Sequence, residues 1–169
     1  MIIMGIDTAI RCTGYGVIDV QSVNKMSILD CGVIKNTQSM PHSECLRRLS
    51  CGIRQLAETF KPDVVSIEDA FSGRNVKTAM ILSLARGAAI AALAEKHIPV
   101  YAYSPKTAKK AAVGFGGASK EQVASMAAAL FNINITDIPL DSTDALALAI
   151  CHANAASRPE LSFLLPKPV

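Results

Sequence analysis

The chain has 169 residues, of which 50% are hydrophobic and 18% are charged, and its formal net charge is +3. This apolar content excludes intrinsic disorder, and the mild positive charge permits an anionic partner without requiring one. The longest uncharged stretch, 122–136, contains polar side chains and is shorter than the roughly 18 apolar residues that a membrane span needs. The five cysteines form no CxxC pair, and the N-terminus lacks a positively charged leader. We therefore expect a cytoplasmic protein with reduced cysteines and no zinc site.

The first part of the chain predicts three strands and a helix. The apolar run 2–7 ends at an acid and is typical of a central strand that is covered on both faces. The segments 14–20 and 25–35 follow after short linkers, which favours an antiparallel meander. Between 43 and 60, apolar residues recur at helical spacing with arginines between them, so an amphipathic helix is expected there, ended by Pro62.

Beyond this helix, strands alternate with helices. The expected elements are, in order, a strand at 63–68, a loop at 70–75, a helix from about 75 to 96, a strand at 99–103, and helices opening at Ser104-Pro105, at the capping box Ser119-Lys-Glu-Gln122 and at Asp141, the last ending at 156. The small and apolar residues of 84–94 predict a helix packed on nearly every side. We expect a single α/β domain at 1–156, with three layers and a mixed five-stranded sheet with helices on both faces, and a Pro-containing tail at 157–169.

Four acids stand where a catalytic site could form. Asp7 and Glu68 each end an apolar strand, and ligands of open α/β sheets bind at the carboxyl ends of strands. Asp141 and Asp144 are spaced i,i+3 at the start of an apolar helix, so they would share one face of it. Four converging carboxylates repel one another unless a hard cation binds between them, and two Mg²⁺ ions about 3.5–4 Å apart can hold the attacking and leaving oxygens of a phosphodiester. The acids therefore predict metal-dependent phosphoryl transfer with water as the nucleophile.

Ordinary structural roles would also explain most of these acids. Asp141 could cap the helix, and Asp144 could be a first-turn acid favoured by the helix dipole. Asp7 could cap the turn after its strand, whereas Glu68 has no obvious structural role. Spacing alone leaves both a metal site and a set of capping residues open.

An ordered set of short motifs resembles the RuvC family of bacterial Holliday-junction resolvases. The set runs over residues 2–152 and comprises Gly5-Ile-Asp7, Gly14-Tyr-Gly-Val-Ile18, Ser66-Ile-Glu68 with Phe71 and Asn75, Ala85-Arg-Gly87, Val113-Gly-Phe-Gly116, Lys120-Glu-Gln-Val123 and Asp141-Ser-Thr-Asp-Ala-Leu-Ala-Leu-Ala149. Each motif is weak alone, whereas the ordered set is specific. The family usually has Pro-Gly after its first Asp, but Thr8-Ala9 stand here. That turn is therefore either reshaped or, if Ala9 has a positive φ, strained by about 1 kcal/mol.

The resemblance implies a ribonuclease H-like fold and a homodimer that nicks two opposed strands of a four-way DNA junction in recombination and repair. It implies that two Mg²⁺ ions per subunit, for which Mn²⁺ can substitute, are bound by Asp7, Glu68, Asp141 and Asp144. Lys109 and Lys120 would lie near the scissile phosphate, and Phe71 would stack on junction bases. The resemblance also implies a branch-migration helicase of the RuvA and RuvB type as a partner.

Basic residues near these elements would contact DNA phosphates without carrying sequence information; they are Arg74, Lys77, Lys106 and Lys110. Each lysine could instead be a solvated surface residue, and Phe71 could be a core residue. The small residues of 85–92 could form a dimer interface or pack the helix on the sheet. Two other functions stay open, namely a ribonuclease H-like nuclease acting on RNA, of the YqgF type, and a non-catalytic junction-binding module.

Overall fold

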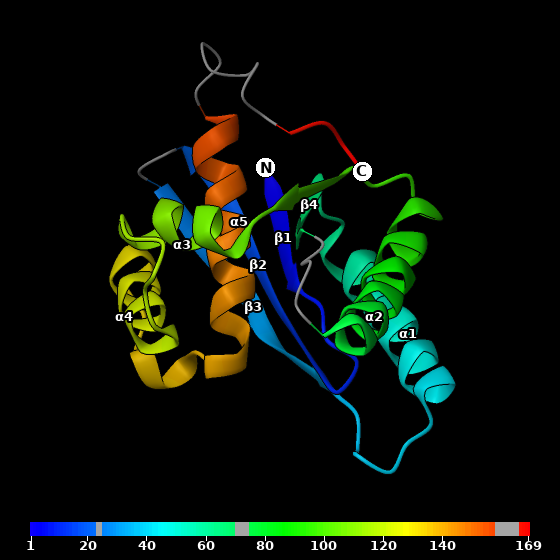
Figure 1. The fold of residues 1–169 in the computed structure, drawn as a ribbon. Coiled ribbons are helices and arrows are strands. Elements are labelled where there is room, and N and C mark those ends of the chain that lie inside the picture. The colour runs from blue at the N-terminus through cyan, green and yellow to red at the C-terminus, as the bar shows by residue number, and fades with distance from the viewer. Residues whose placement is uncertain (23–24, 70–74, 158–165) are drawn as a thin grey trace.

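The computed structural model describes residues 1–22, 25–69, 75–157 and 166–169. A five-stranded sheet is covered by helices on both faces (Figure 1), as the predicted α/β class requires. The elements are, in chain order, β1 (Ile2–Asp7), β2 (Cys12–Ser22), β3 (Lys25–Lys35), α1 (His42–Phe60), β4 (Val64–Glu68), α2 (Val76–Ala94), β5 (Val100–Tyr103), α3 (Pro105–Val113), α4 (Lys120–Phe131), η1 (Ile135–Asp137), η2 (Leu140–Ser142) and α5 (Thr143–Ala156), where η marks a 3-10 helix.

The sheet is mixed, with the strand order β3-β2-β1-β4-β5. The first three strands form the expected antiparallel meander, whereas β4 runs parallel to β1 and β5 runs parallel to β4. Strand β1 lies in the centre, and its residues Ile3, Met4 and Ile6 are fully buried. Because β1 and β4 are parallel neighbours, their carboxyl ends meet at one edge of the sheet, where Asp7 and Glu68 lie.

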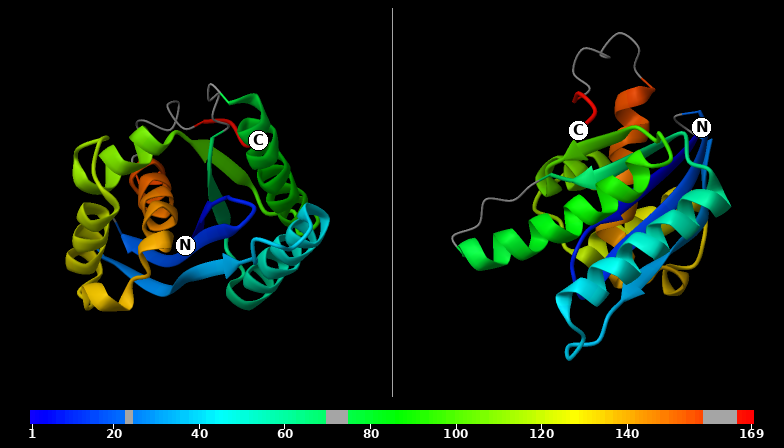
Figure 2. Two further views of the ribbon diagram at one scale, coloured as in Figure 1. Left: turned by 60° about the horizontal axis from the view of Figure 1, so that its bottom comes forward. Right: turned by 90° about the vertical axis from the view of Figure 1, so that its right-hand side faces the viewer.

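Side chains that alternate along the strands build two separate cores. Met4 and Ile67 belong to the core under α1 and α2, and Ile3 and Val64 belong to the core under α3, α4 and α5. Figure 2 shows these two helical layers on opposite sides of the sheet. Since every second residue of a strand shares a face, Asp7 and Glu68 lie on the α5 face.

The backbone of α5 lies directly against the backbone of the sheet, because glycines occupy the positions of β1 and β2 that the helix crosses. A Cβ on Gly5 would overlap the carbonyl oxygen of Ala145, and a Cβ on Gly14 would overlap that of Asp141. Gly5 faces Gly16 across the β1–β2 ladder, and a Cβ on Gly16 would meet the side chain of Leu146 at 2.5 Å. The glycines of the two strands therefore set how closely the helix approaches the sheet.

The last helix begins later than the sequence predicts. Asp141 lies in η2, and α5 begins at Thr143. The Ser142 hydroxyl donates to the Pro139 carbonyl oxygen at 2.7 Å, and the Thr143 hydroxyl donates to that of Leu140 at 2.8 Å. The Ser142 N–H also donates to the Pro139 carbonyl oxygen at 2.9 Å, a bond over three residues that defines a 3-10 turn, so Asp141 is neither a helix cap nor on the face of α5.

The expectation that 84–94 is packed on nearly every side is wrong. One face of α2, with Ala85 and Ala89, is fully buried, and α2 packs on α1. The outer face exposes Val76, Met80 and Leu84 by 70%, 65% and 52%. By length and composition alone α2 is apolar enough to cross a membrane, and 22% of it is buried inside the protein. The apolar composition of α2 thus reflects one buried face and one exposed apolar face, and not a helix that is buried on all sides.

The turn after β1 is reshaped and not strained. Among the described residues, the non-glycine residues with a positive φ are Lys61, His97 and Asn132, so Ala9 avoids the left-handed region. The Ala9 N–H donates to Thr13 Oγ1 at 3.2 Å, and the Thr13 hydroxyl donates back to the Ala9 carbonyl oxygen at 2.7 Å. The replacement of Pro-Gly therefore leaves β1 in place.

The five cysteines are free thiols, as expected. Within the expected tail at 157–169, residues 158–165 lie outside the described residues. The N–H of Val169 donates to the carbonyl oxygen of Val100 at 2.9 Å. The last described segment therefore contacts β5.

We predict that Gly5→Ala lowers the free energy of unfolding by about 2–3 kcal/mol or more, because an over-packed backbone contact cannot relax by a change of rotamer. The control is Gly52→Ala in α1, where a Cβ would meet only the tip of the Ile34 side chain and where alanine favours the helix by about 0.5–1 kcal/mol. Urea unfolding followed by circular dichroism measures both. If Gly5→Ala is as stable as the wild type, α5 does not rest on β1 this closely.

Candidate active site

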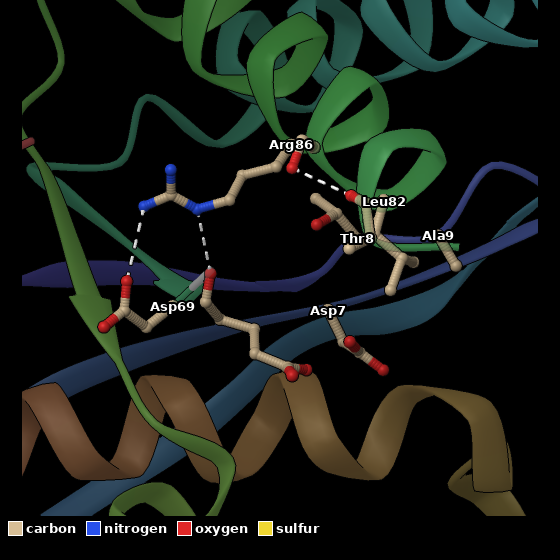
Figure 3. A pocket seen from close by; sticks show the side chains of 9 residues that line it. Asp7, Thr8, Ala9, Asp69, Leu82 and Arg86 are labelled. Carbon is tan, nitrogen blue, oxygen red and sulfur yellow. Dashed lines mark hydrogen bonds and ion pairs between the residues drawn. The ribbon is translucent and has the colours of Figure 1, made fainter. Parts of the chain in front are cut away.

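The structure brings the four predicted acids to one edge of the sheet. Asp7 ends β1, Glu68 ends β4, Asp141 lies in η2 and Asp144 lies in the first turn of α5. The carboxyl groups of Asp7 and Glu68 are hydrogen-bonded to each other, and the charge of Asp144 acts on both. Figure 3 shows the Asp7 side chain pointing away from α2 and toward α5. Asp7, Glu68 and Asp144 thus act on one another between the sheet and the first turn of α5, and Asp141 is linked to Asp144 through Lys120.

Burial and mutual repulsion hold a proton on the Asp7–Glu68 pair. Burial raises the pKa of Asp7 above its ordinary value, against the hydrogen bond from Glu68, and the charge of Asp144 raises it further. Burial, the hydrogen bond with Asp7 and the charges of Asp7 and Asp144 raise the pKa of Glu68 to about 8. At neutral pH the two carboxyl groups therefore share one proton.

Both lysines predicted to be catalytic lie against the other two acids. Lys109 Nζ, on α3, is 3.4 Å from Asp144 Oδ1. Lys120 Nζ, at the start of α4, is 3.5 Å from Asp141 Oδ1 and 3.7 Å from Asp144 Oδ2. Burial lowers the pKa of Lys120, but the charges of Asp144 and Asp141 outweigh it, so that its pKa is raised. Lys120 therefore stays charged at neutral pH.

The carboxylates fit a hard divalent cation by chemistry, although they do not yet converge on one point. Among the described residues, no three His, Cys, Asp or Glu side chains are arranged to hold a metal ion as they stand. The shared proton and the lysines instead compensate the negative charge. Asp144 Oδ1 is shielded from solvent and accepts no hydrogen bond, although Lys109 Nζ lies 3.4 Å away. An unsatisfied carboxylate oxygen beside a protonated pair is an oxygen ligand of the kind that Mg²⁺ prefers.

The remaining predicted DNA contacts lie on the surface or outside the described residues. Lys106 and Lys110 are exposed on α3, and Lys77 is exposed in the first turn of α2. Phe71 and Arg74 lie outside the described residues. The structure therefore places three of these five residues, all of them accessible to a polyanion.

Two residues without a predicted role also border the acids. The Arg86 guanidinium donates from Nε to the Glu68 carbonyl oxygen at 3.1 Å (Figure 3). The Cys12 thiol donates to Asp141 Oδ2 at 3.5 Å. Arg86 stands within one of the family motifs, which was a signal that sequence reasoning did not use. No motif pointed to the thiol of Cys12, whose contact depends on where η2 packs.

A cavity of about 160 Å³ separates the acid pair from α2. Asp7 and Glu68 line it from the sheet, and Ala79, Ser83 and Arg86 line it from α2. Figure 3 shows Asp7 and Arg86 on its two sides. Because the Asp7 side chain points toward α5, this space lies behind the acid pair, between the sheet and α2.

The family model of crossover junction endodeoxyribonuclease RuvC matches residues 3–152 of this chain. A crossover junction endodeoxyribonuclease RuvC from Ruminiclostridium cellulolyticum is 42% identical over 155 residues, which cover 92% of this chain and 93% of that protein. One from Chlorobaculum parvum is 42% identical over 151 residues, which cover 89% and 80% of the two chains.

Solved structures are similar over nearly the whole chain. T. thermophilus RuvC in complex with a Holliday junction substrate has a TM-score of 0.88 at 32% identity, and the match covers 100% of this chain and 99% of that one. The yeast mitochondrial Holliday junction resolvase Ydc2 has a TM-score of 0.64 at 18% identity, covering 95% and 83%, a likeness that shows the fold alone. The ribonuclease H-like fold expected from the sequence is confirmed.

We predict that Glu68→Gln raises the free energy of unfolding of the metal-free protein at pH 8, and raises it less at pH 5. Because the pKa of Glu68 is raised to about 8 from an ordinary value of 4.5, the stability that its protonated form contributes is lost as the pH rises toward 8. Glutamine cannot ionise and keeps an amide for Asp7. Thermal unfolding in a chelator at both pH values measures the effect.

The control for this prediction is Glu44→Gln. The hydrogen bond from Arg47 lowers the pKa of the exposed Glu44 carboxyl, so its loss should not stabilise the protein at pH 8. Equal melting temperatures of Glu68→Gln and the wild type at pH 8 would contradict the protonated acid pair.

Proposed function

The chain belongs to the RuvC family of crossover junction endodeoxyribonucleases, and from this membership we propose that it resolves four-way DNA junctions by paired symmetric nicks. The observation that carries the proposal is the meeting of four acids and two lysines at one edge of the sheet. T. thermophilus RuvC, which is similar over the whole chain, has been solved in complex with a Holliday junction substrate. Its likeness supports the same class of substrate here.

We propose that two Mg²⁺ ions per subunit, replaceable by Mn²⁺, bind to the carboxylates of Asp7, Glu68, Asp141 and Asp144. Bound ions of this kind lower the pKa of an attacking water and stabilise the 3′ leaving oxygen. Asp7 and Glu68 stand at the ends of paired strands. The Asp141 side chain is 53% exposed on η2, and it would exchange its contacts with Lys120 and Cys12 for an ion. The shared proton of the acid pair would leave as the site is loaded.

Lys109 and Lys120 would stabilise the negative charge that develops on the phosphate in the transition state. Their side chains are 22% and 41% exposed, so Lys109 is shielded while Lys120 is open to an approaching strand. The exposed Lys77, Lys106 and Lys110 would add salt-dependent phosphate contacts. Stacking of Phe71 on unpaired bases and a phosphate contact by Arg74 stay proposals that rest on the family resemblance.

Two symmetric nicks need two active sites, and the outer face of α2 offers the surface for a homodimer. Val76, Met80 and Leu84 follow one another by about one helical turn and are more than half exposed. Gly87 is exposed on the same face, and nothing lies within 4 Å of a Cβ built on it. An apolar stripe of this kind marks an interaction surface. We propose that the α2 helices of two subunits pack there about a two-fold axis.

The enzyme would act in the cytoplasm on junctions delivered by a helicase of the RuvA and RuvB type. A nuclease acting on RNA and a non-catalytic junction-binding module are the competing functions, because carboxylates alone do not choose between DNA and RNA. The acids and both lysines are present and close together, which argues against a module that has lost its activity. Phe71→Ala would test the junction contact separately, by lowering resolution without changing metal binding.

We predict that the purified protein with Mg²⁺ makes paired nicks in a synthetic four-way junction and leaves an RNA–DNA hybrid intact. Asp7→Asn should abolish cutting but leave junction binding intact or tighter, since removal of a negative charge near phosphates cannot weaken their attraction. Asp137→Asn, at an exposed acid of η1, is the control and should cut normally. Labelled-strand gels measure cutting, and band shifts in Ca²⁺ measure binding.

Each outcome of this experiment separates the candidate functions. Binding without cutting by the wild type would leave a junction-binding module, and cutting of the hybrid would favour the RNA nuclease. A fully active Asp7→Asn protein would refute the metal role of Asp7.

We predict that Met80→Glu dissociates the dimer, because a charge would be buried between two apolar helix faces. The matched control is Met126→Glu on α4, where the methionine is also exposed, by 45%, but lies outside the α2 face. Sedimentation equilibrium gives the mass of each protein. A monomeric wild type, or a Met80→Glu protein that stays dimeric, would contradict an interface on α2.

A further inference from the structure

We propose that Arg86 is a positioning residue for cleavage, which holds the end of β4 so that the Glu68 carboxyl group faces Asp7. The inference rests on the proposed function, because it concerns the same acids. It gives a role to a guanidinium that sequence reasoning left unassigned. Arg86 would act through the backbone and not through contact with the substrate.

The contacts of Arg86 lie on both sides of the peptide that follows Glu68. Its Nε donates to the Glu68 carbonyl oxygen at 3.1 Å, and its Nη2 is 4.0 Å from Asp69 Oδ1. The arginine side chain is only 20% exposed. A guanidinium presents its donors in one rigid plane, so the hydrogen bond to the Glu68 carbonyl oxygen restrains this peptide directly, and the longer ion pair with the Asp69 carboxylate helps to keep the guanidinium in place.

Arg86 faces the backbone of Glu68, while the carboxyl group of the same residue is turned to Asp7. The charges that act most on that carboxyl are those of Asp7, Asp144 and Lys109. In Figure 3, Arg86 lies on the α2 side and Asp7 on the opposite side of the cavity. The guanidinium therefore does not neutralise the acid pair and instead orients one member of it.

The end of β4 needs such support because its hydrogen-bonded pairing with β1 ends before Glu68. The ladder between β1 and β4 ends with Ile6 opposite Ile67, so Glu68 lies beyond the pairing with the central strand. On the other side, Glu68 is opposite Tyr103, and the Asp69 N–H donates to the Tyr103 carbonyl oxygen at 2.9 Å. In the strand ladders this peptide is thus paired on its β5 side, and Arg86 contacts it from α2.

Loss of this contact should slow cutting more than it weakens binding. A peptide that rotates at Glu68 carries the carboxyl group away from Asp7, and a misplacement of about 1 Å near a reacting centre can reduce a rate by about 100-fold. Junction binding depends mainly on phosphate contacts elsewhere. The expected signature is therefore a reduced cleavage rate with an unchanged dissociation constant.

The experiment compares Arg86→Met and Arg86→Lys with the control Arg54→Met. Arg54 also joins α2 to a neighbouring element, through Nε at 3.3 Å from Glu95 Oε2, but far along α2 from the acids. Three measurements are made on the full-length protein: the single-turnover rate on a four-way junction with Mg²⁺, junction affinity in Ca²⁺, and Mn²⁺ binding without DNA by calorimetry.

We expect Arg86→Met to cut about 10- to 100-fold more slowly, to bind the junction within about two-fold of the wild type, and to bind Mn²⁺ more weakly. Arg86→Lys should recover part of the rate, because a lysine can reach one of the two partners. Arg54→Met should match the wild type in all three. If Arg86→Met does not fold, Arg86→Lys tests the proposal instead: its cleavage rate should fall while its dissociation constant for the junction stays unchanged.

A wild-type rate for Arg86→Met, or an equal loss in Arg54→Met, would overturn the positioning role. A loss of junction affinity that matches the loss of rate would make Arg86 a DNA contact and would overturn it as well. A wild-type protein that cuts no junction would instead refute the proposed function, so the two failures are distinguishable.

Discussion

The backbone contact between α5 and the centre of the sheet is the constraint on which the site depends. It exists because Gly5 and Gly14 present no side chain to the helix and to the turn before it. Any larger residue would hold α5 away and would move Asp144 from the acids that end β1 and β4. The glycines therefore contribute to the chemistry without touching a substrate: they set the distance over which carboxyl groups from separate elements can act on one another.

Four acids that lie near one another repel each other, and the protein reduces this repulsion in two different ways. The strand acids Asp7 and Glu68 share a proton, because burial raises the pKa of each. Asp144 is instead paired with Lys109 and Lys120, whose charges can later face a phosphate. The fold can therefore form before a cation binds, and a cation has to compete with a proton on one side and with lysines on the other.

The sequence was sufficient for the alternation of strands and helices, since the periodicity of apolar residues depends on local geometry alone. The sequence also placed Asp7 and Glu68 correctly at strand ends, because each acid ends an apolar run that is typical of a buried strand. It misplaced Asp141, which lies in a 3-10 turn closed by the bond from the Ser142 N–H to the Pro139 carbonyl oxygen. It also misjudged α2, because composition does not tell which apolar face is covered. The contact of Arg86 joins residues 18 positions apart and follows only from the packing of α2.

Helix α2 combines three surfaces that sequence patterns alone would assign to separate elements. Its alanine face, with Ala85 and Ala89 fully buried, lets the helix lie close to its neighbours. Its second side carries Arg86 to the end of β4, and its third exposes the stripe that includes Met80. A second subunit packed on the third side, as proposed above, would therefore lie on the same helix that holds Arg86 against the Glu68 carbonyl oxygen.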